Sequence, residues 1–382
     1  MRIGLLTDGY RPGTNGVIHF ISRHKRTLES LGHEAFVFTW GQQNPDDEPG
    51  VVRSPGLRFI KPGYHVAFSY SRQARQLLQT MDVLHANQPV LSGTLALRYS
   101  RRYDIPTALT CHSRYDLLGV TLLPFIPLSF YRAILRAYLR RCGHRYGVVT
   151  TPSAEASRMM RDLGLEGPIE VVPYGIELDH YRQVKGQPGR QELGLPEDAV
   201  VALFVGRLAA EKNVAFLLEA LAQLDLTHAY LLIVGDGPQR HDLETRAREL
   251  ALTNRVRFVG EITHDQVPPY FALADLFVTA SRIEVLPRSV IEAMAAGLPI
   301  VGIDQPWIRQ LVRPGTNGLL ADPQASALAR VWARVVKDPA LRTRLAEGAL
   351  TVSERYSVHR TTARMVNLYR HLVEDRLTGS HG

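Results

Sequence analysis

The chain has 382 residues, of which 45% are hydrophobic and 21% charged. This length favours two domains of about 150 residues or more, and the composition excludes a disordered, collagen-like or coiled-coil protein. The chain has two cysteines, Cys111 and Cys142, which is too few for a disulfide framework or a cysteine-based metal site. The first apolar run reaches Asp8 too early for a signal peptide, so we expect a cytoplasmic protein.

The net charge of +8 lies entirely in the first half of the chain. Residues 1–173 contain 21 Lys and Arg against 13 Asp and Glu, whereas the remainder contains 24 of each. A basic half beside a neutral half favours an anionic partner, either nucleic acid or a membrane surface. The longest weakly polar run, residues 117–131, contains two prolines and is shorter than the roughly 20 residues that span a bilayer, so we expect peripheral contact at most.

Short apolar segments alternate with amphipathic segments along the whole chain. In order, the apolar segments are IGLLTD, EAFVFTW, VLHAN, TALTCH, GVVTTPS, VALFVGR, YLLIVGDG, VRFVG, LFVTAS and PIVGID. Apolar strands separated by helices are typical of parallel sheets covered on both faces. The sequence therefore predicts an α/β protein of two doubly wound halves, with a break between residues 173 and 197 and a final helix over about 358–377.

Two segments carry candidate anion-binding groups. The first strand is followed by DGYRPGTNGV, in which Gly13 and Gly16 allow backbone N–H groups to approach an anion at a helix N-terminus; a tight turn without a ligand explains them equally well. In the second half, Arg207 follows a strand and Lys212 begins the next helix. Two cations at a strand end suit a diphosphate, although a solvated basic loop has the same pattern.

The later strands of the second half end in further polar and glycine positions. Gly235 and Gly260 each end a strand, where a plain turn is the alternative interpretation. Glu284 lies in a loop after a strand, and Glu292 lies eight residues later in the following helix. These carboxylates are placed to accept hydrogen bonds from sugar and ribose hydroxyls. Their order after the two cations and the glycine turns makes a chance arrangement the weaker interpretation.

These motifs together resemble the retaining GT-B glycosyltransferases of glycosyltransferase family four, which include bacterial lipid glucosyl- and mannosyltransferases. The matching segments follow the family's order over nearly the whole chain: PGTNGV, CHSRY at 111–115, TTPSAEA at 150–156, VPYGIE at 172–177, VGRLAAEKN, IVGDGP, VRFVG and the segment ending EAMAAGLPIV. The resemblance implies two Rossmann-like domains with a cleft between them, at 1–178 on the acceptor side and 190–357 on the donor side. It also implies that a C-terminal helix, about 358–382, packs back on the first domain.

The resemblance implies a role for each matching residue. Arg207 and Lys212 correspond to the pair that holds the donor diphosphate, Glu284 to the residue that binds the donor sugar, and Glu292 to the one that holds the ribose. Gly16 belongs to the loop that closes on the phosphates, and Gly235 and Gly260 belong to the donor site. His112 is similar to the acceptor-side histidine, which makes His112, Arg207, Lys212 and Glu284 the expected catalytic residues. Many relatives have glycine where this chain has Val285, so the donor loop departs from the family pattern here.

The expected chemistry uses no metal or other cofactor. The sequence has no Asp-x-Asp, HExxH or CxxC motif, so the cations and helix N-termini would stabilise the departing nucleoside diphosphate. In such retaining enzymes, the acceptor attacks the face that the leaving group quits, and a phosphate oxygen takes its proton.

The acceptor is predicted from a basic helix in the first half. Residues 117–154 contain no acidic residue, and Arg132, Arg136 and Arg140 recur at a spacing that places them on one helix face, with the apolar positions on another. Such a helix suits docking on anionic lipid, although an ordinary packed helix with a solvated face is the alternative. We therefore expect hexose transfer from a UDP- or GDP-sugar to a lipid such as diacylglycerol, on the inner face of the membrane. A soluble sugar or polysaccharide acceptor is the second hypothesis. A nucleic-acid-binding protein is the third, and no binding module supports it.

Overall fold

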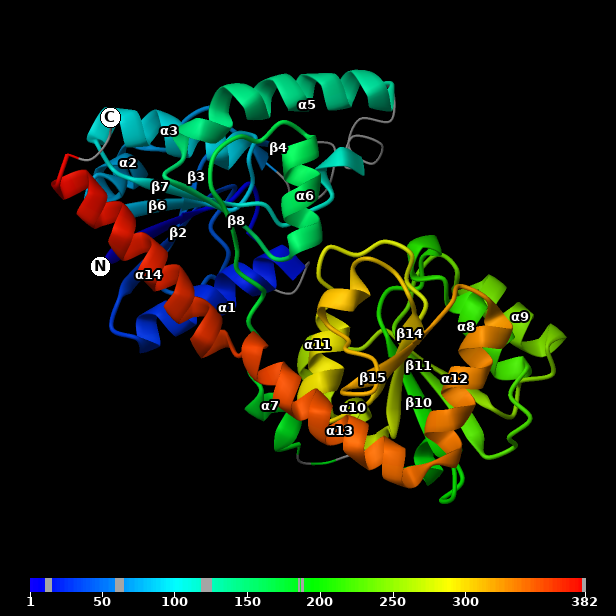
Figure 1. The fold of residues 1–382 in the computed structure, drawn as a ribbon. Helices are drawn as coiled ribbons and strands as arrows, with labels where there is room; N and C mark the ends of the chain where they lie inside the picture. Colours follow the sequence, from blue (N-terminus) through cyan, green and yellow to red (C-terminus); the bar gives the residue numbers. More distant parts are fainter. Residues whose placement is uncertain (11–15, 59–64, 118–125, 185, 187–188, 380–382) are drawn as a thin grey trace. The chain divides into compact units, whose positions relative to one another are not determined.

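The computed structural model describes residues 1–10, 16–58, 65–117, 126–184, 186 and 189–379. It divides into two compact units, the first formed by residues 1–175 and 358–382 and the second by residues 176–357. In each unit a parallel sheet lies between layers of helices (Figure 1), as the alternation of apolar and amphipathic segments predicted. Within the described residues, no helix combines the length and apolar character needed to cross a bilayer.

The first unit contains a seven-stranded sheet in the order β3-β2-β1-β6-β7-β8-β9, with all neighbouring strands parallel. Its strands are β1 (Arg2–Leu6), β2 (Glu34–Trp40), β3 (Val51–Ser54), β6 (Val83–Ala86), β7 (Thr107–Thr110), β8 (Val148–Thr151) and β9 (Ile169–Val171). A small hairpin of β4 (Leu57–Arg58) and β5 (His65–Val66) stands apart from this sheet.

Two hydrophobic clusters cover the two faces of the first sheet. Successive strand residues point to opposite faces, so Leu5 belongs to one cluster and Leu6 to the other. The cluster containing Leu6 is completed by α2 (Arg72–Leu78), α3 (Leu91–Tyr103), α5 (Leu128–Cys142) and α6 (Ala154–Asp162). The cluster containing Leu5 is completed by α1 (Gly16–Ser30) and α14 (Val358–Leu377), so the last helix of the chain packs in the first unit.

The second unit contains a six-stranded parallel sheet in the order β12-β11-β10-β13-β14-β15. Its strands are β10 (Val200–Val205), β11 (Ala229–Val234), β12 (Val256–Gly260), β13 (Leu276–Thr279), β14 (Ile300–Ile303) and β15 (Gly318–Ala321). The helices are α7 (Asp179–Arg182), α8 (Val214–Ala222), α9 (Arg240–Glu249), α10 (Pro268–Leu273), α11 (Arg288–Ala295), α12 (Ala325–Lys337) and α13 (Pro339–Ser353). A cluster that includes Trp332, Leu328 and Leu231 forms the core between α8, α12 and this sheet.

The strand order reverses once in each sheet. In the first unit, β1 and β6 are the two central neighbours: β2 and β3 follow on the side of β1, and β7, β8 and β9 follow on the side of β6. In the second unit, β10 and β13 are the corresponding central neighbours. The loops after such paired strands diverge to opposite faces, so a crevice opens at the carboxyl ends of the strands, where ligands bind in open α/β sheets. Arg207 follows β10 and Glu284 follows β13, at the reversal in the second sheet, whereas His112 follows β7 in the first unit.

Candidate functional site

The loops after β10 and β13 bring two of the candidate residues into contact. Nζ of Lys212 lies 2.5 Å from Oε1 of Glu284, although 72 residues separate them in the chain. The side chains are 23% and 13% exposed, so this ion pair is largely shielded from water. The neighbouring positions of β10 and β13 in the sheet explain the contact, because the ends of adjacent parallel strands meet at one edge.

A backbone hydrogen bond links these two loops. The N–H of Arg282, in the loop after β13, donates to the carbonyl of Glu211 over 2.9 Å. Lys212 ends a short 3₁₀ turn, and Asn213 then adopts the left-handed conformation with φ of 54° before α8 begins. Lys212 is therefore presented from a backbone that is fixed on both sides of it.

Arg207 lies at the same edge but in a more open environment. Its side chain is 68% exposed and pairs with Glu211 over 3.0 Å. It also lines a cavity of about 520 Å³ together with Gly235 and Gly237. The segment that follows β10 thus carries two cations, the exposed Arg207 and, five residues later, the partly shielded Lys212.

The glycines at the strand ends permit close backbone packing. Gly235 has φ of +133°, and a Cβ atom there would overlap the carbonyl oxygen of Gly206. Its N–H donates to the carbonyl of Gly260, which itself has φ of +97°. A side chain at Gly235 would push apart the ends of β10 and β11, so backbone geometry requires this glycine whether or not a ligand binds.

Glu292 occupies a separate, more buried position in α11. The residue is 4% exposed, and its Oε1 accepts a hydrogen bond from Arg288 over 3.2 Å. The same arginine nitrogen lies 3.1 Å from Nε2 of His264. The sequence reasoning missed Arg288, although its spacing of four residues before Glu292 on one helix was a usable signal.

In the first unit, His112 follows β7 and is 4% exposed. Its Nε2 lies 3.1 Å from Oδ1 of Asn87, and its Nδ1 lies 3.3 Å from the hydroxyl of Tyr174. Burial, with a smaller contribution from His24, lowers the pKa of His112 to about 3. The imidazole is therefore neutral near pH 7 and hydrogen-bonded through both nitrogens.

Gly16 is the first residue of α1, and no atom of the described residues lies within 4 Å of the position of a Cβ atom there. Within the part of the chain that the structure describes, the N-terminus of this helix is thus open on the side of Gly16. Gly13 and most of the PGTNGV segment lie outside the described residues.

The basic face of α5 is less uniform than the spacing indicated. Nε of Arg132 donates to the carbonyl of Asp116, whose carboxylate lies 3.9 Å from the same guanidinium. Arg136 donates to the carbonyl of Asp162, and Arg140 is exposed. Asp116 therefore partly neutralises the charge of Arg132. It directly precedes residues 117–154, the segment that contains no acidic residue.

Two apolar side chains of α5 that the sequence analysis did not single out are exposed. Phe130 is 58% exposed and Ile134 is 53% exposed, one helical turn apart. Because residues four apart lie on one helix face, these side chains form a small apolar patch. Most of the predicted apolar loop before α5, residues 118–125, lies outside the described residues.

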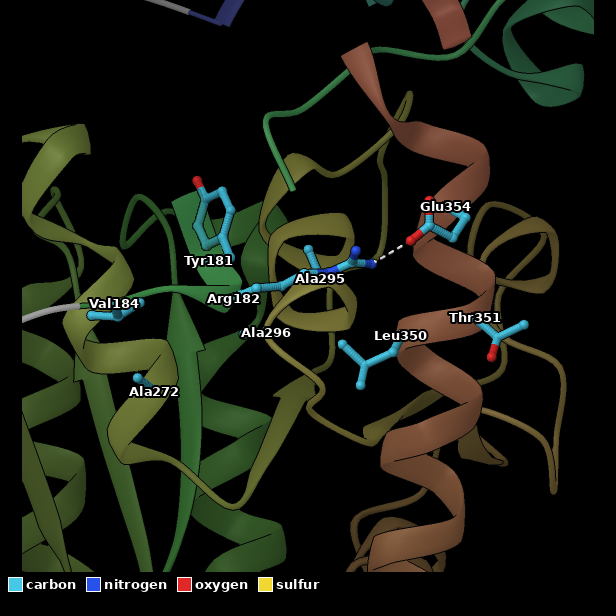
Figure 2. Close-up of a pocket in the computed structure, with 9 residues that line it drawn as sticks. All are labelled: Tyr181, Arg182, Val184, Ala272, Ala295, Ala296, Leu350, Thr351 and Glu354. Atoms are coloured by element: carbon cyan, nitrogen blue, oxygen red, sulfur yellow. Dashed lines mark hydrogen bonds and ion pairs between the residues drawn. The ribbon is translucent and has the colours of Figure 1, made fainter. Parts of the chain in front are cut away.

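A second cavity, of about 740 Å³, lies in the second unit between α7, α10, α11 and α13 (Figure 2). Arg182 and Glu354 form an ion pair of 2.7 Å beside it. The lining residues are Tyr181, Arg182, Val184, Ala272, Ala295, Ala296, Leu350, Thr351 and Glu354. None of the predicted site residues is among them. In the described part of the chain, no three His, Cys, Asp or Glu residues gather as a metal site would require.

Comparisons with known proteins agree with this arrangement. The family model for glycosyl transferases group 1 matches residues 187–351, and that for Glycosyltransferase Family 4 matches residues 14–180. An alpha-monoglucosyldiacylglycerol synthase of Streptococcus pneumoniae (strain ATCC BAA-255 / R6) is 27% identical over 343 residues, covering 84% of this chain and 75% of that protein. A 2-deoxystreptamine glucosyltransferase of Streptomyces kanamyceticus is 32% identical over 283 residues, covering 71% of each chain.

Among solved structures, Anabaena HepE in complex with UDP superposes with a TM-score of 0.78 at 20% identity, covering 97% of this chain and 100% of the other. This likeness extends over both parallel-sheet units and supports the predicted GT-B fold. The chain belongs to the sugar-transferring enzymes of glycosyltransferase family four.

Proposed function

We propose that this protein transfers a hexose from a UDP- or GDP-sugar to a membrane lipid such as diacylglycerol, with retention of the anomeric configuration and without a metal ion. The observation that carries the donor half of this proposal is the contact between Lys212 and Glu284 at the reversal of strand order. It joins a cation suited to phosphate and a carboxylate suited to sugar hydroxyls in one small space.

The donor would be held by groups that differ in exposure. The ammonium of Lys212 would neutralise diphosphate oxygens, whose charge grows as the glycosidic bond breaks, and Arg207 would add a second cation from the solvent side. Glu284 would then exchange its bond with Lys212 for hydrogen bonds from the hexose. Glu292, held by Arg288, would accept the ribose hydroxyls. In the first unit, the N-terminus of α1 at Gly16 is by itself suited to bind phosphate oxygens.

Retention needs no second carboxylate in this scheme. The acceptor hydroxyl would attack from the face that the diphosphate leaves, so that the new bond forms on the same side of the sugar as the old one. Its proton would pass to an oxygen of the leaving phosphate. Lys212 and Arg207 would stabilise the charge that develops on this leaving group, which is the role a divalent ion plays in other transferases.

The lipid acceptor is supported by α5. Its exposed Phe130 and Ile134 lie on the same helix as Arg136 and Arg140, which is the pattern of a helix that rests in a membrane interface. One similar protein is named for the synthesis of a glucosyl diacylglycerol. The proposed location is the inner membrane face.

A soluble acceptor is the second candidate. The specific observation in its favour is the 32% identity to a protein named as a glucosyltransferase of 2-deoxystreptamine, which exceeds the 27% identity to the lipid enzyme. The two candidates share the donor chemistry and differ only in what the first unit binds.

The test is a transfer assay with a panel of UDP- and GDP-hexoses, each with diacylglycerol-containing anionic vesicles or with soluble amino-cyclitol and sugar acceptors. We expect product only with vesicles, and an α-linked product from an α-linked donor by proton NMR coupling constants. Transfer to soluble acceptors alone would replace the lipid acceptor, and an inverted product would overturn the retaining mechanism. Absence of donor turnover with every nucleotide sugar would overturn the donor site.

Vesicle binding tests the role of α5 directly. Changing Arg132, Arg136 and Arg140 to Gln should weaken binding to anionic vesicles by up to about 100-fold, since each basic residue contributes about 1 kcal/mol near an anionic surface. The matched control changes three exposed basic residues of α12 in the second unit, Arg330, Arg334 and Lys337, to Gln. Equal binding by both triple variants and the parent would remove α5 as the docking helix.

A further inference from the structure

The side chains that follow β6 and β7 form a buried hydrogen-bonded unit. Asn87 comes directly after β6 and is 1% exposed, and His112 lies two residues after β7. These strands are parallel neighbours, with Leu84 opposite Thr107, so their carboxyl ends meet at the same edge of the sheet. The bond between Nε2 of His112 and Oδ1 of Asn87 is the result of this arrangement.

The other bonds of Asn87 establish which end of its amide faces the imidazole. Its Nδ2 donates to the backbone carbonyls of Leu6, over 3.3 Å, and His85, over 3.4 Å. An amide turned the other way would place its oxygen against these two carbonyl oxygens, which have no proton to donate. Oδ1 therefore faces His112 as an acceptor, and the proton of the bond between them belongs to Nε2 of the histidine.

The remaining nitrogen of His112 consequently carries a lone pair. Nδ1 lies 3.3 Å from the hydroxyl of Tyr174, which also lies 3.0 Å from the backbone carbonyl of His112, so the single hydroxyl proton is shared between these two acceptors. The rings of His112 and Tyr174 are stacked, with centroids 5.6 Å apart, and Phe20 packs against the imidazole at 4.8 Å. The ring is therefore held in orientation by contacts on its edges and its face.

We propose that Asn87 is a positioning residue for sugar transfer, which holds His112 as the neutral Nε2–H tautomer so that Nδ1 presents a lone pair. This role rests on the proposed function, because it concerns the acceptor-side histidine of that reaction. His112 then serves as an oriented hydrogen-bond acceptor at the carboxyl edge of the first sheet. It does not carry a proton between substrates.

The surroundings of His112 agree with a neutral ring. The titratable groups around it include the hydroxyl of Tyr174, Tyr115, His85, and His24, which stacks on Phe20. Burial lowers the pKa of His24 to about 4, so it too is neutral, and no carboxylate forms a hydrogen bond or ion pair with His112 among the described residues.

Nitrogen NMR of the full chain with ¹⁵N-labelled histidine tests the tautomer without substrate. The His112 signals are assigned by their loss in His112→Gln, and at pH 7 we expect a protonated Nε2 and an unprotonated Nδ1. Asn87→Leu removes the acceptor at similar volume and should shift the His112 nitrogens toward a mixture of tautomers. It should also lower kcat by at least about tenfold with little change in donor KM, because the ring loses its orientation.

Two further variants separate positioning from general loss of packing. Asn87→Asp keeps an acceptor for Nε2–H, so it should retain the tautomer, and its charge should bring the titration of His112 upward toward neutral pH. Asn317→Leu removes an amide that is equally buried in the second unit, where it binds the carbonyl of Leu311. This control should lose stability without altering the His112 signals.

Specific outcomes would overturn the proposal. A wild-type His112 that is charged or carries its proton on Nδ1 contradicts the tautomer, as does an unchanged spectrum in Asn87→Leu. A changed spectrum with unchanged kcat contradicts the role in the reaction. A wild-type protein that turns over no nucleotide sugar overturns the proposed function and this catalytic role together, whereas transfer by the wild type with an unexpected tautomer overturns the positioning role alone.

Discussion

Replacing Lys212 with Met should affect both stability and activity, because the ion pair with Glu284 is partly buried. At 2.5 Å and an effective dielectric constant near 20, the gross Coulomb attraction is about 7 kcal/mol, and desolvation of the two charges offsets most of it. Losing one partner leaves the other charge uncompensated, which costs about 3–5 kcal/mol at fully buried sites. Because Glu284 remains 13% exposed and Lys212 23%, we expect the free energy of unfolding to fall by about 2 kcal/mol.

Arg207→Met is the matched control for this variant. Arg207 is 68% exposed and forms an i,i+4 pair with Glu211, so its loss should change the free energy of unfolding by no more than about 0.5 kcal/mol. Donor turnover should nevertheless fall about 100-fold in each variant, since each removes one group that stabilises the leaving diphosphate.

Urea unfolding and donor hydrolysis, measured on the same preparations, separate the two effects. A double-mutant cycle with Lys212→Met and Glu284→Gln should give a coupling of about 1–2 kcal/mol in stability. If Lys212→Met is as stable and as active as the parent, the contact contributes nothing to either property. If Arg207→Met lowers the free energy of unfolding as much as Lys212→Met does, then side-chain exposure does not explain the difference expected between the two variants.

Three further predictions concern the donor and the pH dependence. Glu292→Gln should weaken binding of free nucleoside diphosphate, whereas Glu284→Gln should impair mainly the intact sugar donor; calorimetric titrations with equal losses would contradict this division. Turnover should survive EDTA, and full loss that magnesium restores would reveal a metal requirement. Burial raises the pKa of Asp8 from 3.8 to about 6, so the folded state holds this proton more tightly and stability falls, by at most about 3 kcal/mol, as the pH rises from 4 to 6. Asp8→Asn can still accept the N–H of Ser92 and should be the more stable form above pH 6 in thermal unfolding; a variant that is less stable there would refute the argument.

The alternation of apolar and amphipathic segments predicted two parallel sheets, and its ten apolar segments correspond to ten of their thirteen strands; β3, β9 and β15 are not among them. A parallel strand buried on both faces must be apolar along its length, so VALFVG and YLLIVG are visible without knowledge of their partners. Family motifs then indicated the candidate residues, and their positions after strands placed them at the carboxyl edges of the sheets.

Only the tertiary structure decided which of these residues touch. The pairing of Lys212 with Glu284 depends on β10 and β13 being neighbours, and that order is set by long-range strand pairing rather than by local sequence. The same reason hid Asn87 from the sequence analysis, because its partner His112 lies on another strand. The exposure of Phe130 and Ile134 was equally invisible, since the amount of apolar surface that a helix leaves uncovered depends on what packs against it. Sequence periodicity thus determined most of the strands, and long-range packing determined the contacts that give each site its chemistry.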